Sequence, residues 1–224
     1  MEVVARGVLR LLLAMTEWTQ RAHVLADHAV SGVLGHVSSL HFDTMSELLW
    51  VGSASGQLTS HTGALPTLPR YTSLAAHGVP KQPRHVRGIL SDDKFIISLS
   101  EGRVCASQRQ GLGRWSMQIE DHAPGVALAG LCASPQSASS DIIVGGAAPN
   151  SHDALFALHS ISGRVVRSAV SDGTVTQLRK GSRYLCVGTE QGTIQLHDPR
   201  SLRAEHKLPA HHGGLIDLQT DGHL

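Results

Sequence analysis

The stretch LLWVGSASGQLTSHTG, residues Leu48–Gly63, decides the fold of this chain. It begins with an apolar run, continues with a tight turn between Gly52 and Gly56, and ends with a second run in which apolar and polar residues alternate. Two such runs around a glycine-containing turn predict a β-hairpin.

The chain repeats this pattern three times. Taking Val51, Ile97, Val144 and Val187 as equivalent points, the copies are 46, 47 and 43 residues apart. A regular period in this range is typical of a repeat fold. The later copies are KFIISLSEGRVCAS from Lys94, DIIVGGAAPNSHDALFALHS from Asp141, and YLCVGTEQGTIQLHD from Tyr184.

Each period reads as four short strands, of which the second is almost entirely apolar and is therefore expected to be buried on both faces. Four strands per period of about 43 to 47 residues predict the blade of a WD40-like β-propeller. We therefore expect an all-β chain with a partial propeller over residues 30–224. The repeats are expected near residues 36–80, 81–124, 125–170 and 171–212, with another beginning at 213–224.

WD40 hallmarks are present in a reduced form. Gly35 and His36 stand where the class places its Gly-His pair, and Asp198 takes the place of the terminal aspartate, preceded by histidine instead of tryptophan. With Gly52 and Gly188, the hairpin glycines of the first and last copies, we interpret these residues as structural. Only 4% of the residues are aromatic, so regular WD40 repeats are not expected.

Composition excludes several function classes. A net charge of +1 gives no global basic field for strong, sequence-independent binding to nucleic acid. Three widely spaced cysteines without a C-x-x-C motif indicate neither a disulfide framework nor a cysteine zinc site, and they favour a reducing compartment.

The first 29 residues remain unassigned. The stretch Val3–Met15 has some features of a signal peptide, but Arg6 and Arg10 interrupt it and no suitable cleavage site follows, so a short strand or amphipathic helix is the preferred interpretation. The sequence has no apolar run near the roughly 18 residues of a membrane span, and we expect no membrane partner.

Other site motifs are weak. Fifteen histidines suggest metal binding, yet His211 and His212 are adjacent and would point to opposite faces of a strand, so we expect no metal site. GSASG at residues 52–56 lacks the serine of a nucleophile elbow, and GLGRWS at 111–116 lacks the last glycine of a dinucleotide fingerprint. We expect no catalytic residue.

One basic segment is a candidate contact surface. Arg70, Tyr71, Arg84 and Arg87 lie in a stretch that contains no acidic residue, and a tyrosine ring can stack on a base. Two interpretations stay open: solvated loop charge, or a contact to RNA or a protein partner, since propellers bind through loops at their rims and faces.

Three segments carry a family resemblance. HFDTMSELLWVGSASGQLTSHTGALPTLPRYTSLAAH at 41–77 resembles the first propeller blade of the catalytic subunit of the poly(A)-nuclease (PAN) deadenylation complex. Residues 181–224, beginning GSRYLCVGTEQGTIQLHD, look like a later blade, and residues 97–119, beginning ISLSEGRV, are similar to the region between them. Together the segments cover roughly residues 38 to 224.

This resemblance implies a function and partners. The family's catalytic subunit is a poly(A)-specific 3′-exoribonuclease that acts in mRNA deadenylation, in the cytoplasm and in P-bodies, with a pseudokinase-like regulatory subunit and with poly(A)-binding protein on poly(A) RNA. Its nuclease domain would use divalent metal, Mg²⁺, held by clustered carboxylates that begin with a D-x-E motif. These 224 residues contain no D-x-E, so we expect no cofactor and no catalysis in this chain.

The region matches only part of such a propeller. Seven blades of about 45 residues need about 315 residues, whereas Val30 to Leu224 supplies 195. We therefore expect about four blades of a truncated propeller with a scaffold function. The alternatives are an unrelated WD40-like interaction scaffold and, less favoured, a small hydrolase.

Overall fold

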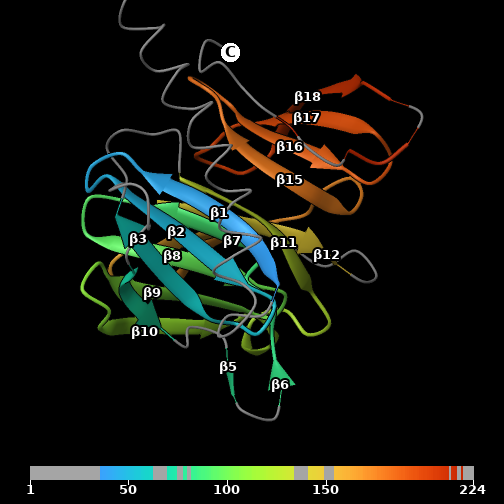
Figure 1. The fold of residues 1–224 in the computed structure, drawn as a ribbon. Coiled ribbons are helices and arrows are strands. Elements are labelled where there is room, and N and C mark those ends of the chain that lie inside the picture. Colours follow the sequence, from blue (N-terminus) through green and yellow to red (C-terminus); the bar gives the residue numbers. More distant parts are fainter. Residues whose placement is uncertain are drawn as a thin grey trace, which may run out of the picture.

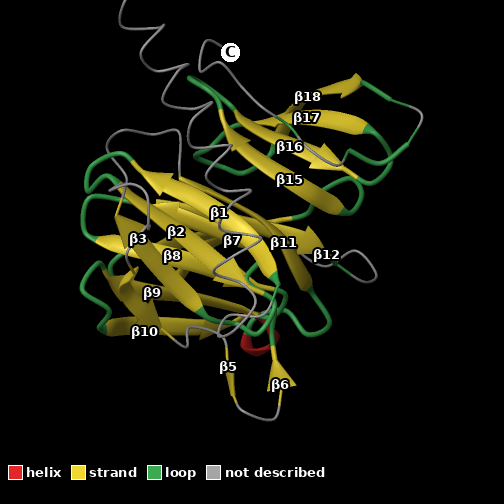
Figure 2. Ribbon diagram, in the orientation of Figure 1, coloured by secondary structure: helices red, strands yellow, loops and turns green. Residues whose placement is uncertain are grey.

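The structure is a computed structural model of the chain, and it describes residues 36–62, 70–74, 78–79, 82–133, 141–148, 154–211, 213–215 and 218. In these residues four antiparallel sheets of four strands make up nearly all the regular structure. Figure 2 shows one short helical turn beside them, the 3-10 helix Ile119–Asp121. The expected all-β fold is therefore confirmed.

The strands of each sheet follow one another in the sequence, so each sheet is a simple meander. We call the sheets blades 1 to 4. Blade 1 consists of β1 (Val37–Asp43), β2 (Leu48–Ser53), β3 (Leu58–Thr62) and β4 (Arg70–Leu74). Blade 2 consists of β7 (Gly88–Ser91), β8 (Phe95–Ser100), β9 (Arg103–Gln108) and β10 (Gly113–Gln118). Blade 3 consists of β11 (Ala127–Ala133), β12 (Asp141–Ala147), β13 (Leu155–His159) and β14 (Val165–Ala169). Blade 4 consists of β15 (Val175–Lys180), β16 (Leu185–Thr189), β17 (Thr193–His197) and β18 (Ala204–Pro209).

The blades are joined through their first strands. β1 contacts β7, β7 contacts β11, and β11 contacts β15, so these four strands are the inner ones. The fourth strands lie at the outside, and β18 is exposed along its whole length. Figure 1 shows this succession in colour, from blue in blade 1 to red in blade 4. It is the arrangement of a partial propeller.

Most strands lie where the sequence pattern predicts them. The apolar run LLWVGS predicts a strand over residues 48–53, and β2 has these bounds. Two features between blades 1 and 2 were not predicted: strand β4, and the small hairpin of β5 (Gly78–Val79) and β6 (Gln82–Pro83). The segment GLIDLQT also has the pattern of a strand over residues 214–220, but this segment falls largely outside the described residues.

The core lies between neighbouring blades. Every residue of β2, β8 and β16 is buried, as expected for strands covered on both faces. Trp50 and Leu58 of blade 1 pack with Ile96 of blade 2. Larger clusters around Ile97 and Val144, and around Leu155 and Leu178, fill the next two junctions.

The repeated hairpin is also repeated in its hydrogen bonds. Gln57 N donates to Ser53 Oγ at 3.0 Å, and Thr193 N donates to Thr189 Oγ1 at 3.2 Å. The glycine within each turn, Gly56 or Gly192, has a φ of 81° or 77°, a conformation that favours glycine. In both blades the hydroxyl residue therefore accepts the same turn hydrogen bond, and the glycine allows the same positive φ.

The chain direction places the connections on two faces of the propeller. The turns between second and third strands share one face with the segments that lead from one blade to the next. We call this the connection face; its described segments include residues 54–57, 84–87, 101–102, 119–126 and 190–192. The remaining turns lie on the opposite face.

Candidate interaction surface

The predicted structural residues hold turns and blade junctions. Gly35 lies outside the described residues. His36 has an exposed side chain and acts through its backbone, because Ala54 N donates to His36 O at 2.7 Å. Glu190 N donates to Thr174 O at 2.9 Å at the equivalent place in blade 4.

Gly52 and Gly188 occupy equivalent positions in β2 and β16, and each faces an incoming segment. A Cβ at Gly52 would lie 2.3 Å from Ser39 Oγ and 2.6 Å from Val86 Cγ1, the latter in the segment that enters blade 2. A Cβ at Gly188 would lie 3.3 Å from Leu215 Cδ1. The packing around Gly52, at the junction of blades 1 and 2, is therefore tighter than the packing around Gly188 in blade 4.

Asp198 organises the turn between β17 and β18 on the opposite face. Its carboxylate accepts hydrogen bonds from Arg200 N at 3.1 Å, and from Ser201 N and Oγ at 3.0 and 2.8 Å. The hydrogen bond from Ser201 is the largest influence on its pKa, which is lowered. The preceding His197 is fully buried, and its Nδ1 lies 2.8 Å from Leu202 O.

Polar contacts also link blades 1 and 2. Nε of Arg109 lies 2.7 Å from Oδ2 of Asp43, and Arg109 also donates to the carbonyl oxygens of Asp92 and Asp93. Nearby, Ser91 N donates to His41 Nε2 at 3.2 Å. Burial lowers the pKa of His41, against the attraction of Asp43. Asp43 is buried and its partners are mostly half-buried, so these contacts contribute to the packing of blades 1 and 2.

The candidate contact residues do not form one cluster. Arg70 and Tyr71 lie in β4, and Arg70 pairs in register with His61, at the end of blade 1 away from the connection face. Arg84 and Arg87 lie on the connection face in the segment that enters β7. These four residues are close in the sequence, but the direction of the strands places Arg70 and Tyr71 towards one face of the propeller and Arg84 and Arg87 on the other.

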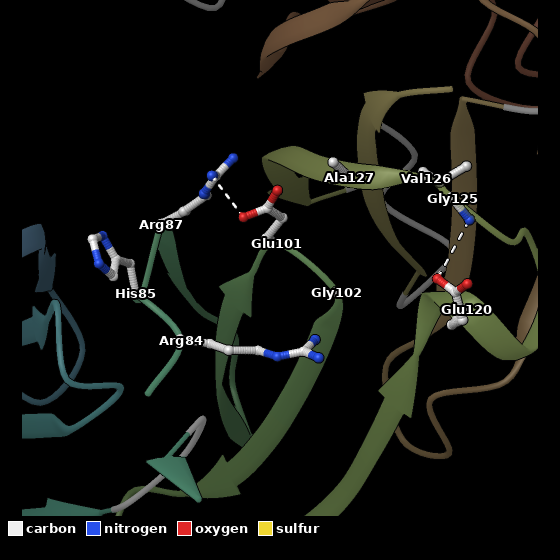
Figure 3. A pocket seen from close by; sticks show the side chains of 9 residues that line it. All are labelled: Arg84, His85, Arg87, Glu101, Gly102, Glu120, Gly125, Val126 and Ala127. Atoms are coloured by element: carbon white, nitrogen blue, oxygen red, sulfur yellow. Dashed lines mark hydrogen bonds and ion pairs between the residues drawn. The ribbon is translucent and has the colours of Figure 1, made fainter. Parts of the chain in front are cut away.

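Arg84 and Arg87 line a hollow of about 570 Å³ between blades 2 and 3. Figure 3 shows how its walls come from three places: the segment before β7, the turn between β8 and β9, and the start of β11 with the residues before it. Its lining residues are Arg84, His85, Arg87, Glu101, Gly102, Glu120, Gly125, Val126 and Ala127.

The hollow contains acidic groups that the local sequence does not reveal. Glu101 Oε2 lies 3.0 Å from Arg87 Nη2, and Glu120 Oε2 accepts a hydrogen bond from Gly125 N at 3.3 Å. The segment from Arg70 to Arg87 has no acidic residue of its own, yet neighbouring connections bring two carboxylates to it. The signal that could have found Glu101 is its place in the turn after a buried second strand, which ends on the connection face.

Within the described part of the chain, no group of three or more histidine, cysteine, aspartate or glutamate residues has the arrangement of a metal site. None of the three cysteines, all of which are described, forms a disulfide, and all three are buried. Burial raises the pKa of Cys105 to about 11 and that of Cys132 to about 12, so neither thiol is a ready nucleophile. No helix in the described residues has the length and apolar character needed to cross a membrane.

Four-stranded meanders joined through their inner strands define the chain as a WD40-type β-propeller protein. Solved structures agree with this class. The Neurospora crassa Pan2 WD40 domain superposes with a TM-score of 0.71 at 26% identity, over 83% of this chain and 53% of that domain. The WD40 propeller of Doa1 superposes with a TM-score of 0.62 at 14% identity, over 80% of this chain and 56% of the Doa1 chain. At this identity the likeness shows the fold alone.

Sequence comparison gives the particular family. The family described as PAN2 N-terminal matches residues 22–224, and the chain belongs to this family. It is 33% identical over 188 residues to the PAN2-PAN3 deadenylation complex catalytic subunit pan2 of Aspergillus oryzae, and 31% identical over 189 residues to that of Schizosaccharomyces pombe. The matches cover 84% of this chain but only 15% and 16% of those relatives. The chain thus corresponds to the N-terminal WD40 region, and the resemblance noted from the sequence is confirmed.

Proposed function

We propose that this chain is the scaffold propeller of a subunit that shortens mRNA poly(A) tails, and that it binds the PAN regulatory subunit and the poly(A) ribonucleoprotein. The observation that carries the proposal is the family match over residues 22–224. The names of the relatives, as catalytic subunits of a PAN2-PAN3 deadenylation complex, supply the biological setting. In this proposal the chain acts in the cytoplasm, including P-bodies, without a cofactor.

The fold supports a binding function. Its described turns present side chains on two faces, and the hollow on the connection face combines charged groups of both signs. These 224 residues contain no D-x-E motif, so the proposal assigns the chain no phosphodiester cleavage of its own. Purified chain incubated with Mg²⁺ and end-labelled oligo(A) is expected to release no AMP.

A co-purification experiment tests the proposal. The tagged chain is mixed with the PAN regulatory subunit of the same organism, and the Doa1 propeller serves as a control that shares the fold alone. Retention of the regulatory subunit by this chain and not by the control supports the proposal. Equal retention by both, or by neither, favours the alternative of an unrelated WD40-like scaffold.

The second partner requires a separate measurement. Poly(A) RNA coated with poly(A)-binding protein, naked poly(A), and the free binding protein are each passed over the immobilised chain. We expect the coated RNA to be retained most strongly, because the proposed partner is the assembled ribonucleoprotein. Equal retention of naked poly(A) would assign the binding to RNA alone.

A further inference from the structure

The hollow between blades 2 and 3 has walls that backbone hydrogen bonds hold in place. Arg87 N donates to Leu99 O at 2.7 Å, which fixes the segment that enters β7. Leu128 N donates to Glu101 O at 2.7 Å, and Ile119 N donates to Gly102 O at 3.0 Å. The three walls are therefore tied to one another, and the hollow exists before any partner binds.

The two arginines that line this hollow differ in their pairing. Among the described residues the guanidinium of Arg84 has no hydrogen-bond or ion-pair partner, whereas Arg87 is paired with Glu101. Figure 3 shows the side chain of Arg84 passing beside Gly102 and pointing towards the side where Glu120 lies. A free guanidinium beside a cavity is suited to a planar carboxylate, which it binds through two parallel hydrogen bonds.

Gly102 makes room for this arrangement. A Cβ at this position would lie 2.3 Å from Nη1 of Arg84, so any other residue would displace the guanidinium. The same glycine keeps its backbone tied to Ile119. The position of the Arg84 head group therefore depends on a residue that carries no charge.

The charge balance discriminates between two kinds of partner. A phosphate backbone repeats a negative charge at every nucleotide, and Glu101 and Glu120 would repel the phosphates on either side of one held by Arg84. A polypeptide can instead place one carboxylate on Arg84 and an N–H or ammonium group on Glu120. Buried Val126 and its neighbour Ala127 add an apolar wall that suits a side chain.

We infer that this hollow binds an extended polypeptide segment of a partner, with an acidic side chain on Arg84 and a hydrogen-bond donor of the same segment on Glu120. The inference deepens the proposed scaffold function, since it names the chemistry by which the propeller would hold a protein partner. It assigns the hollow to a peptide and not to RNA.

Peptide selection tests the site directly. A phage-displayed library of random peptides is selected on the folded chain and counter-selected on Arg84→Glu. Enriched peptides are expected to share an acidic residue. Their affinity, measured by fluorescence anisotropy, should fall at least about tenfold for Arg84→Ala, which corresponds to about 1.4 kcal/mol. Gly102→Ala keeps every charge but moves the guanidinium, and it should weaken binding in the same direction.

Two controls complete the design. Arg114→Ala removes an exposed arginine of the same blade outside the hollow, and it should leave peptide affinity unchanged. Changing the acidic residue of a selected peptide to lysine should restore binding to Arg84→Glu, which a merely structural effect of the substitution could not do.

Several outcomes would overturn the inference. They are a selection without enrichment, peptides whose binding ignores Arg84→Ala, and an oligo(A) probe that loses affinity with Arg84→Ala and competes with the peptides. The result is independent of the co-purification test. Peptide binding at Arg84 without retention of the PAN regulatory subunit would contradict the proposed function alone, and retention without peptide binding would contradict this site alone.

Discussion

Nε of Arg109 lies 2.7 Å from Oδ2 of Asp43, and this contact joins the turn after β9 in blade 2 to the end of β1 in blade 1. The side chain of Asp43 is 1% exposed and that of Arg109 is 16% exposed. Burial by itself would raise the pKa of Asp43, but the Arg109 hydrogen bond and charge, with the Met45 N–H, lower it. The ion pair between Arg109 and Asp43 therefore stabilises the junction of blades 1 and 2.

Replacing Arg109 by alanine should therefore destabilise the fold strongly. We expect the free energy of unfolding to fall by about 3 to 5 kcal/mol, because the buried carboxylate of Asp43 loses its counter-charge. Urea denaturation followed by circular dichroism measures the change. The matched control is Arg87→Ala, whose exposed pair with Glu101 should contribute at most about 1 kcal/mol. Equal losses in the two variants would contradict the assigned role of Arg109.

The two hairpin glycines provide a second matched comparison. Gly52→Ala would force a Cβ to within 2.6 Å of Val86 Cγ1, whereas Gly188→Ala meets its nearest neighbours at 3.3 Å. We expect Gly52→Ala to cost about 1 to 3 kcal/mol through overpacking, and Gly188→Ala to remain close to wild type. Thermal unfolding of the two variants, measured side by side, decides this. A larger loss at Gly188 would contradict the described packing.

Substitution of Asp198 tests the role of the terminal aspartate, one of the WD40 hallmarks that this chain retains. Replacing it with alanine removes the acceptor for three hydrogen bonds in the turn after β17. Because the turn is exposed, we expect a modest loss of about 1 kcal/mol, similar to that of a capping residue. Asp198→Asn keeps an acceptor oxygen and should lose less. If both variants unfolded at the wild-type urea concentration, the aspartate would have no measurable part in the turn.

The buried second strands were predictable from the sequence, whereas the outer strands were less so. LLWVGS is apolar on both faces, and the structure gives β2 the predicted bounds. β4 escaped prediction because Pro66 and Pro69 precede it. An outer strand also needs no apolar residues on its exposed side, so its pattern is weak.

The hollow could be predicted only in part. The basic segment was visible as a run without acidic residues, and Arg84 and Arg87 do lie together at the hollow. Glu101 and Glu120 reach it from other connections, and such approaches between elements are set by tertiary packing. Local sequence therefore identified the cations and missed the carboxylates that change which partner the hollow fits.

The cysteines should be protected from thiol reagents in the native chain. The thiolate is the reactive form, and burial raises the pKa of Cys105 to about 11 and that of Cys132 to about 12. Burial also raises the pKa of Cys186. We expect slow modification by an aromatic disulfide reagent near neutral pH, and rapid modification of all three cysteines in denaturant. Fast reaction of one native thiol would contradict the described burial.

The last prediction concerns pH and follows from His41. Ser91 N donates to Nε2 of His41, so this nitrogen is unprotonated and the half-buried ring is neutral. Burial lowers the pKa of His41 in the folded chain, while Asp43 opposes this, and the unfolded value is about 6.5. Between those two values the unfolded state binds more protons. The contribution of His41 to stability is thus fully present above about pH 6.5 and is lost as the pH falls towards the folded pKa.

His41→Gln separates this contribution from that of His197, whose pKa burial also lowers. Glutamine offers an acceptor oxygen that does not titrate in this range, so the variant should lose less stability than wild type between about pH 7.5 and about pH 5.5. The remaining pH dependence should come from His197 and other histidines. Urea midpoints at the two pH values give the comparison. An unchanged pH dependence in His41→Gln would show that Ser91 does not hold this histidine in its neutral form.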